Sequence, residues 1–459
     1  RAIADVSSNG LSKLFRRSLD DDGKLQRLFK THHGQGFRFV GEVLTEHSVA
    51  DALVTQESSS PQLPSRPSIA VLPFDNMSSA QEKEFLADGI CEDILTALAK
   101  IPELFVIARN STFQYKGRSV DIRAVGRELG VAYVLEGSIR ESSDRLRITA
   151  QLIDSQSGEH VWAERYDKQK AEIFALQDEI TTQIVSAMLG ELITTADQAR
   201  TWVDGTKNFE AWQKVVRATA LNASMNQANM NEAITLLEQA VELDPDFASA
   251  HAVLANANFH FIINGWAADP SPYLLAVLKN ASRARDINPR QPLAAALLAF
   301  AALAMGDKAN AKKLVDESIL FGPNIIASLI LAAMVLGYLE RLDEAARVID
   351  QCSRLSPIGR TTISTTAAFI YSAKGDYETA KIHGRDLLKA DPASVNGLTS
   401  KIIAGRQPGD LQAARQAAKT LMSQVPDFSI EKFLASRFLL NTPIGERPRA
   451  SLEAMNLPA

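Results

Sequence analysis

The side chains best suited to chemistry lie in the first 43 residues, where eight Lys and Arg stand against five Asp and Glu. Arginine can bond guanine and asparagine can bond adenine in the major groove, while lysine and arginine neutralise phosphates. The whole chain has a formal net charge of -5, so any nucleic-acid contact must come from such a local basic surface. Seven residues are candidate DNA contacts: Asn9, Lys13, Arg16, Arg17, Lys30, His33 and Arg38.

Two local elements are expected to position these residues. In "SSNGLSKLFRRSLDDDG", residues 7–23, helical spacing gathers the apolar side chains on one arc and the amide and cations on the other. The apolar side chains are Leu11, Leu14, Phe15 and Leu19. Beyond them, Gly34 and Gly36 permit a tight reversal between the alternating runs "LFKTH" and "FRFV". The pattern predicts an amphipathic helix followed by a basic β-hairpin.

Other interpretations of this segment fit its residues less well. A dinucleotide-binding loop needs a third glycine where Phe39 stands, and the Gly-Lys-Ser/Thr of a P-loop occurs nowhere in the chain. His32 and His33 are adjacent in a predicted strand and would point to opposite faces, which disfavours a metal site. A solvated charged helix face is the remaining alternative. The helix and hairpin together favour double-stranded DNA as the partner.

The stretch "LSKLFRRSLDDDGKLQRLFKTHHGQGFRFV", residues 11–40, resembles the C-terminal part of an OmpR/PhoB-type winged helix-turn-helix. This resemblance implies that residues 1–46 belong to a DNA-binding domain whose β-platform and first helices would precede Arg1. It makes Asn9, Lys13, Arg16 and Arg17 groove or backbone contacts, and Lys30, His33 and Arg38 wing contacts. The family often has arginine in the wing. A neutral His33 would bind more weakly at that place.

Residues 47–67 are rich in Ser and Pro and predict a linker, after which strand and helix patterns alternate from 68 to 193. The order β-α-β-α-β-β-β predicts a small α/β sandwich, with Asp121 as a helix N-cap and Asp75 as a turn residue. We expect Trp162 and Tyr166 in the core. The runs "IAVLPFDNM", "YVLEGSIR" and "GEHVWAERYD" resemble the TolB N-terminal-like α/β domain.

From residue 208 to 440, prolines recur about every 34 positions in Ala-rich helical sequence. The prolines, expected to start helices, are Pro245, Pro289, Pro323, Pro357, Pro392 and Pro426. Twelve residues before each stands a small or apolar residue where two helices would meet: Ala233, Val277, Ala311, Ala345, Ala380 and Ala414. The period resembles that of tetratricopeptide repeats, about six in number. It implies an α-solenoid whose concave groove takes a protein or peptide partner. The longer first interval, "INGWAADPSPY", is expected to project as a loop.

The remaining composition argues for a binding protein. Cys91 and Cys352 are far apart and are expected to be buried and reduced, and no catalytic arrangement stands out, so we expect no enzyme, cofactor or metal. No apolar run long enough for a membrane span or secretion signal occurs, which predicts a cytoplasmic protein without membrane contact. The preferred hypothesis is a bacterial one-component transcription regulator. The alternatives are a tetratricopeptide scaffold that does not bind DNA and the sensor half of a cyclase. A homodimer remains an open alternative for the oligomeric state.

Overall fold

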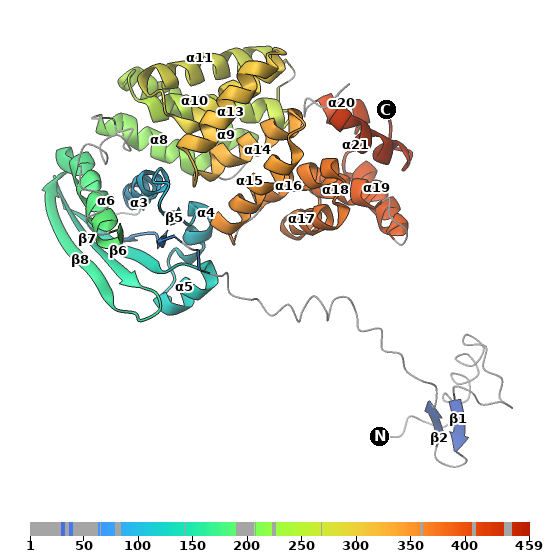
Figure 1. Cartoon of the computed structure of the whole chain (residues 1–459), viewed down its shortest axis with the longest axis horizontal. Helices are drawn as coiled ribbons and strands as arrows, with labels where there is room; N and C mark the ends of the chain where they lie inside the picture. Colours follow the sequence, from blue (N-terminus) through green and yellow to red (C-terminus); the bar gives the residue numbers. More distant parts are fainter. Residues whose placement is uncertain are drawn as a thin grey trace. The chain divides into compact units, whose positions relative to one another are not determined.

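The computed structural model describes two compact units, Arg1–Ser59 and Ser60–Ala459, drawn in Figure 1. The described residues are 29–32, 36–39, 63–64, 66–78, 84–142, 144–189, 206, 208–222, 226–267, 269–358, 361–405, 410–435 and 443–459. In the first unit, strands β1 (Phe29–His32) and β2 (Gly36–Phe39) form an antiparallel pair. The predicted β-hairpin is confirmed. The predicted helix before it lies outside the described residues.

The second unit begins with a mixed sheet of strand order β5-β3-β6-β7-β8, with β4 paired to β6. Strands β3, β5 and β6 are parallel, whereas β6, β7 and β8 are antiparallel. The bounds are β3 Ser68–Val71, β4 Asp75–Asn76, β5 Phe105–Val106, β6 Tyr133–Ser142, β7 Arg145–Asp154 and β8 His160–Gln169. The predicted strands and helices are present, together with the short elements β4, α4 (Arg109–Thr112) and η2 (Phe113–Tyr115). Burial alternates along β7, where Leu146, Ile148, Ala150 and Leu152 are buried.

Helices of different lengths connect these strands or, in the case of α6, follow the last one. Their bounds are α3 Glu84–Ala99, α4 Arg109–Thr112, the 3-10 helix η2 Phe113–Tyr115, α5 Ile122–Leu129, η3 Lys170–Glu172 and α6 Ile173–Leu189. Asp121 caps α5 as predicted, since its side chain accepts a hydrogen bond from the amide of Arg123. Tyr166 is buried and Trp162 packs against the same core, in agreement with the prediction.

One sequence-based expectation in this domain is wrong. Asp75 is not the turn residue: it lies in strand β4, and it is the Asn76 side chain that accepts a hydrogen bond from the Ser78 amide at 2.9 Å. Parallel pairing of Asp75 with Ser138 extends the sheet past the point where the apolar run ends. Phe85 shares the apolar spacing of α3, yet it is 45% exposed, because it lies in the first turn of the helix, ahead of the buried stretch.

The rest of the second unit is an array of paired helices. Their bounds are α8 Phe209–Asn222, α9 Gln227–Leu243, α10 Ala248–Ile263, α11 Ser271–Ile287, α12 Pro292–Ala304, α13 Lys308–Phe321, α14 Ile326–Tyr338, α15 Leu342–Leu355, α16 Thr361–Lys374, α17 Tyr377–Ala390, α18 Val395–Ala404, α19 Leu411–Gln424, α20 Ile430–Ala435 and α21 Pro443–Glu453. The six small or apolar residues singled out from the sequence lie on the second helices of the pairs and are all completely buried. Close helix approach therefore explains their residue types.

The repeat-marking prolines do not start helices as expected. Pro245 lies in the turn between α9 and α10, and each of the other five occupies the same kind of turn, three or four residues before the next helix. Proline suits this place because it fixes one backbone angle in the tight connection between repeats. The prolines therefore mark the boundary between repeats.

The long first interval does not project as a loop. Helices α10 and α11 are each three residues longer than α12 and α13, and their connection is four residues longer. Trp266 in that connection packs edge-on against Phe261 at 5.5 Å between ring centroids, and Tyr273 stacks on Phe261 at 4.7 Å. Aromatic packing therefore folds the insertion back onto the array.

The α/β domain packs directly against the array, with α3 beside α8 and α4 near the end of α15 (Figure 1). Gly89 of α3 permits close contact with α8, since an added Cβ would lie 2.7 Å from Trp212 and from Val216. The side chain of Asn324, in the turn before α14, is buried and donates to the carbonyls of Ala99, Ile101 and Leu104 at 3.1 to 3.4 Å. These contacts fix the domain to the start and the middle of the array.

A third contact lies one repeat further along the array. The Ser111 hydroxyl donates to the Ile358 carbonyl at 2.7 Å and accepts from the Ile358 amide at 3.0 Å. The Ala108 amide donates to the Leu355 carbonyl at 2.8 Å. The loop between α15 and α16 is thereby held by two hydrogen bonds to the Ser111 hydroxyl and by one bond between backbone groups.

Candidate ligand-binding cavity and polar clusters

The structure describes only two of the seven residues that are predicted to contact DNA. Asn9, Lys13, Arg16, Arg17 and His33 lie outside the described residues. Lys30 lies in β1 and Arg38 in β2, where they are register partners across the hairpin. The hairpin therefore brings these two sequence positions together, and the DNA-contacting role of all seven residues stays a prediction.

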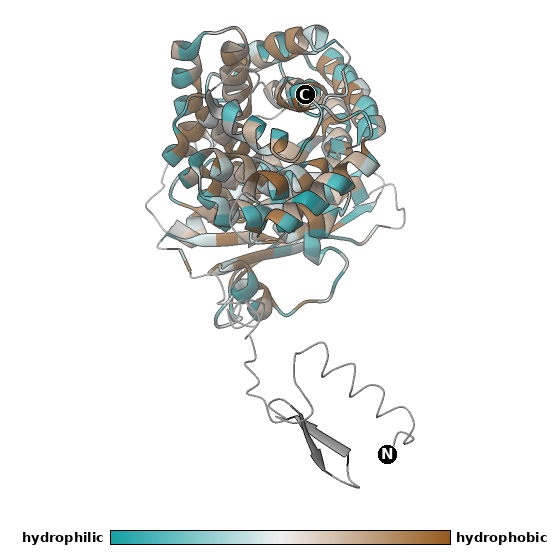
Figure 2. Cartoon of the chain, turned by 90° about the vertical axis from the view of Figure 1, so that its right-hand side faces the viewer, coloured by the Kyte–Doolittle hydropathy of each residue, from teal (hydrophilic) through white to brown (hydrophobic). Residues whose placement is uncertain are grey.

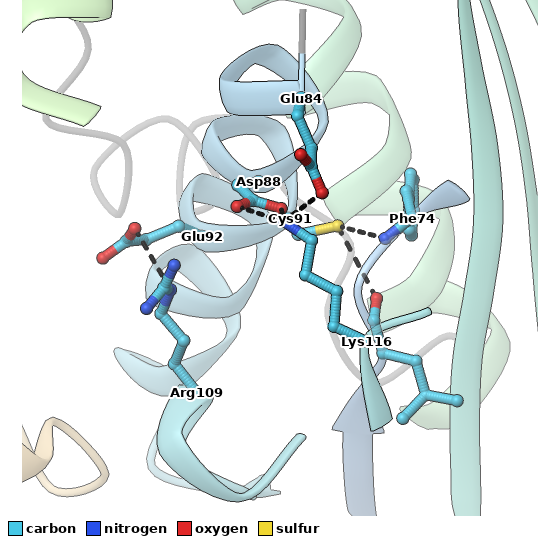
Figure 3. Close-up of polar contacts among 8 residues, drawn as sticks. Phe74, Glu84, Asp88, Cys91, Glu92, Arg109 and Lys116 are labelled. Carbon is cyan, nitrogen blue, oxygen red and sulfur yellow. Dashed lines mark hydrogen bonds and ion pairs between the residues drawn. The ribbon is translucent and has the colours of Figure 1, made fainter. Parts of the chain in front are cut away.

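A charged cluster lies between α3 and the segment from α4 to Lys116 (Figure 3). Lys116 Nζ lies 2.7 and 2.8 Å from the two carboxylate oxygens of Asp88 and 3.0 Å from Glu84, and Arg109 lies 3.4 Å from Glu92. Burial opposes the charge on Lys116, but its hydrogen bonds to the two carboxylates outweigh this effect and raise its pKa. The cluster is a structural ion-pair network, because each cation faces a carboxylate.

Cys91 lies next to this cluster and is no nucleophile. Its Sγ accepts from the Phe74 amide at 3.1 Å and donates to the Leu72 carbonyl at 3.6 Å (Figure 3). Burial raises the pKa of the thiol far above its usual range, so the reactive thiolate does not form near neutral pH. Cys91 and Cys352 are both free and buried, as the sequence predicted.

A second polar cluster joins the α/β domain to α8. One carboxylate oxygen of Asp93, in α3, accepts from Trp212 Nε1 at 2.5 Å and from Gln177 Nε2 of α6 at 2.9 Å. Burial raises the pKa of Asp93 to about 7, even though both hydrogen bonds favour the charged form. A carboxyl group that holds its proton in the folded state makes the stability of this junction depend on pH.

We expect this junction to lose stability as the pH rises. The unfolded Asp93 gives up its proton near the ordinary pKa of 3.8, whereas the folded residue keeps it up to about 7. The contribution of Asp93 to the stability of the fold is therefore complete below pH 3.8 and is lost as the pH rises through about 7. Between about pH 5 and about pH 7, the free energy of unfolding of the chain should fall by on the order of 2 kcal/mol compared with that of the Asp93→Asn variant.

Urea unfolding of both proteins across this pH range measures the difference. Asparagine is the matched control, since its side-chain oxygen can accept from Trp212 and Gln177 without titrating. Parallel pH profiles for the two proteins would contradict the assignment.

A cavity of about 410 Å³ lies on the inner face of the array and is lined by both apolar and polar side chains. Its walls come mainly from the first helices of the repeats, α10, α14, α16 and α18, and Phe433 of α20 and Pro448 of α21 complete it. Helix α21 packs back against α16 and α18. Seen from the C-terminal side, the helices of the array curve around the C-terminus (Figure 2).

Two polar groups in this cavity stand out. Ser372 of α16 is 2% exposed, and neither its Oγ nor the Nδ1 of His260 in α10 hydrogen-bonds to any described residue. Burial lowers the pKa of His260 to about 4, so the imidazole is neutral at physiological pH. The sequence predicted a groove on the first helices but singled out neither residue, because a lone Ser or His in a helical repeat carries no recognisable signal.

Two other kinds of site are missing from the part of the chain that the structure describes. Among those residues, no cluster of three or more His, Cys, Asp or Glu is placed to hold a metal ion. None of the described helices is both long and apolar enough to cross a membrane.

Comparison with known families finds two domains. Residues 65–183 match the HilA/YgeH-like transcriptional regulator, second domain, and residues 219–247 match the tetratricopeptide repeat. The protein called "Putative adenylate cyclase 3" from Rhizobium meliloti (strain 1021) is 46% identical over 241 residues, which are 52% of this chain and 41% of that protein. The chain thus spans well under half the length of this relative.

The solved structures that resemble parts of this chain have low sequence identities and low TM-scores. A thermophilic tetratricopeptide protein from Thermus thermophilus is 17% identical, with 46% of this chain and 99% of that chain covered and a TM-score of 0.33. TolB from Acinetobacter baumannii is 20% identical, with 29% and 30% covered and a TM-score of 0.22. The α/β domain therefore has a regulator family as its sequence match, and the helical array has a tetratricopeptide repeat.

Proposed function

We propose that the protein is a DNA-binding transcription regulator of the one-component type that acts in the cytoplasm. The observation that carries this proposal is the match of residues 65–183 to the second domain of HilA/YgeH-like transcriptional regulators. A basic β-hairpin precedes that domain in the chain, with Lys30 and Arg38 as register partners. An OmpR/PhoB-type winged helix in residues 1–46 would use such a hairpin against DNA. The array is the sensing or docking module, and the chain has no catalytic role.

Duplex DNA binding tests this proposal. Arg16→Ala and Arg38→Ala are each expected to weaken binding to a fluorescent duplex about tenfold, because each removes a charge-assisted contact. Each lost phosphate contact should also reduce the slope of log affinity against log salt by about 1, measured by anisotropy between about 50 and 200 mM salt. Arg217→Ala is the control, since this exposed arginine pairs with Glu232 in the array. Unchanged affinity in both hairpin and helix variants would refute the assignment.

The adenylate cyclase relative supports a second candidate, in which the array and the α/β domain form the sensor half of a cyclase. This candidate predicts no duplex affinity at low salt. It also predicts that the chain, fused to or mixed with a cyclase catalytic domain, alters the rate of cyclic AMP formation. Duplex affinity that depends on Arg16 and Arg38 would favour the regulator.

A further inference from the structure

We propose that the cavity on the inner face of the array binds a small uncharged organic molecule, with an apolar body and hydrogen-bonding groups that pair with Ser372 and with His260. This site goes beyond the proposed function and stands whether or not the chain binds DNA. Through this site the array would respond directly to a small molecule.

The size and the walls of the cavity suit such a molecule. Its volume of about 410 Å³ lies within the range of small-molecule sites. Ile330, Leu331 and Met334 of α14 and Phe369 of α16 supply apolar surface. The exposed side chains of Asn264, Thr361 and Asp391 lie at its rim, so the cavity reaches solvent.

The unpaired polar atoms indicate where polar groups of the ligand bind. Thr399 and Ser400 of α18 line the same cavity, but their hydroxyls donate to helix carbonyls at 2.8 and 2.6 Å. Ser372 Oγ and His260 Nδ1 make no such bond to a described residue. A buried polar atom without a partner costs free energy, and a ligand that pairs with it recovers that cost. Because a neutral imidazole and a hydroxyl can each donate or accept, they suit a carbonyl, amide or hydroxyl group.

The charge of the lining excludes anions. Among the described lining residues there is no Lys or Arg, and His260 is neutral because burial lowers its pKa to about 4. A phosphate or carboxylate would enter without a cation to compensate its lost hydration. Nucleotides and free peptide carboxyl ends are thus poor ligands here.

Binding of Nile red, an uncharged dye whose emission shifts to the blue in apolar surroundings, tests the site on the full chain. We expect saturable binding at one site, and binding of the anionic dye anilinonaphthalene sulfonate at least about tenfold weaker. Ala327→Trp should abolish Nile red binding, because Ala327 is exposed and lines the cavity. Ala309→Trp, on the exposed surface of α13 and outside the cavity, is the matched control and should bind normally.

Ser372→Ala separates a ligand contact from a structural role. The variant should bind Nile red about three- to tenfold more weakly. Without the dye it should melt at the same or a higher temperature, because an unpaired buried hydroxyl is gone. The proposal is overturned if Nile red does not saturate, if Ala327→Trp binds it normally, or if Ser372→Ala retains full affinity. It is also overturned if a mixed-sequence peptide pool displaces the dye, since the cavity would then be a peptide groove.

Discussion

Replacing Trp212 by alanine is expected to lower the free energy of unfolding of the unit from residue 60 to 459 by about 3 to 5 kcal/mol. The indole is 3% exposed and stacks on Phe209 at 5.5 Å, with Phe174 edge-on at 6.0 Å. Its loss leaves a cavity between α3 and α8 and takes one of two hydrogen-bond donors from Asp93. The lost ring packing and the lost hydrogen bond therefore both lower the free energy of unfolding.

Urea unfolding followed by circular dichroism measures this change, and Trp212→Phe separates its two parts. Phenylalanine keeps much of the ring packing but has no N–H, so it should cost about 1 to 2 kcal/mol and raise the pKa of Asp93 further. Equal losses for the alanine and phenylalanine variants would show that the hydrogen bond, and not the packing, dominates. A loss below about 1 kcal/mol in the alanine variant would contradict the tight junction described here.

Asn324→Leu is expected to destabilise the same unit by about 2 to 4 kcal/mol. Leucine can fill the space of the asparagine side chain but donates nothing, so the carbonyls of Ala99, Ile101 and Leu104 would lose this buried donor. Arg66, which donates to Asn324 Oδ1 at 3.2 Å, would lose its acceptor. Limited proteolysis should also cut the segment around residues 100–104 faster, because the side chain ties that segment to the array.

The matched control is Asn310→Leu on α13, an exposed position of the same array. It should change the free energy of unfolding by less than about 0.5 kcal/mol. Similar losses in the two variants would mean that the asparagine side chain does not hold the two parts together.

The local fold could be predicted because its signals are local. Alternation in residues 145–154 and the acid at position 121 set a strand and a helix start through neighbours a few residues away. The fully buried Ala233 and Ala311 follow from the repeat period in the same way. Asp75 and the insertion around Trp266 were interpreted wrongly, because pairing with β6 and aromatic packing on Phe261 depend on distant residues.

No local sequence pattern predicts the contacts between the α/β domain and the array, or the cavity. Trp212 meets Asp93 across 119 positions, and Asn324 follows its proline like any other turn residue. The cavity is completed by Phe433 of α20 and Pro448 of α21, which packs on α16 and α18, and no period in the sequence specifies that contact. Of the candidate DNA contacts, the structure pairs the positions of Lys30 and Arg38, whose basic hairpin came from a local glycine pattern. The DNA-contacting role of all seven residues stays a prediction that the duplex measurements test.

The attachment of the α/β domain to α8, to the turn at Asn324 and to the loop at Ile358 constrains how the gene can change in length. Duplication or deletion of one 34-residue unit between α8 and Pro323 would displace the two later anchor points by a full step of the superhelix, and the same change between Asn324 and Pro357 would displace the last one. In either case α3 and α4 of the domain could not keep all three contacts. Units after residue 361 lie beyond the last of these three anchors, so related genes should gain or lose repeats there and keep the count before it constant.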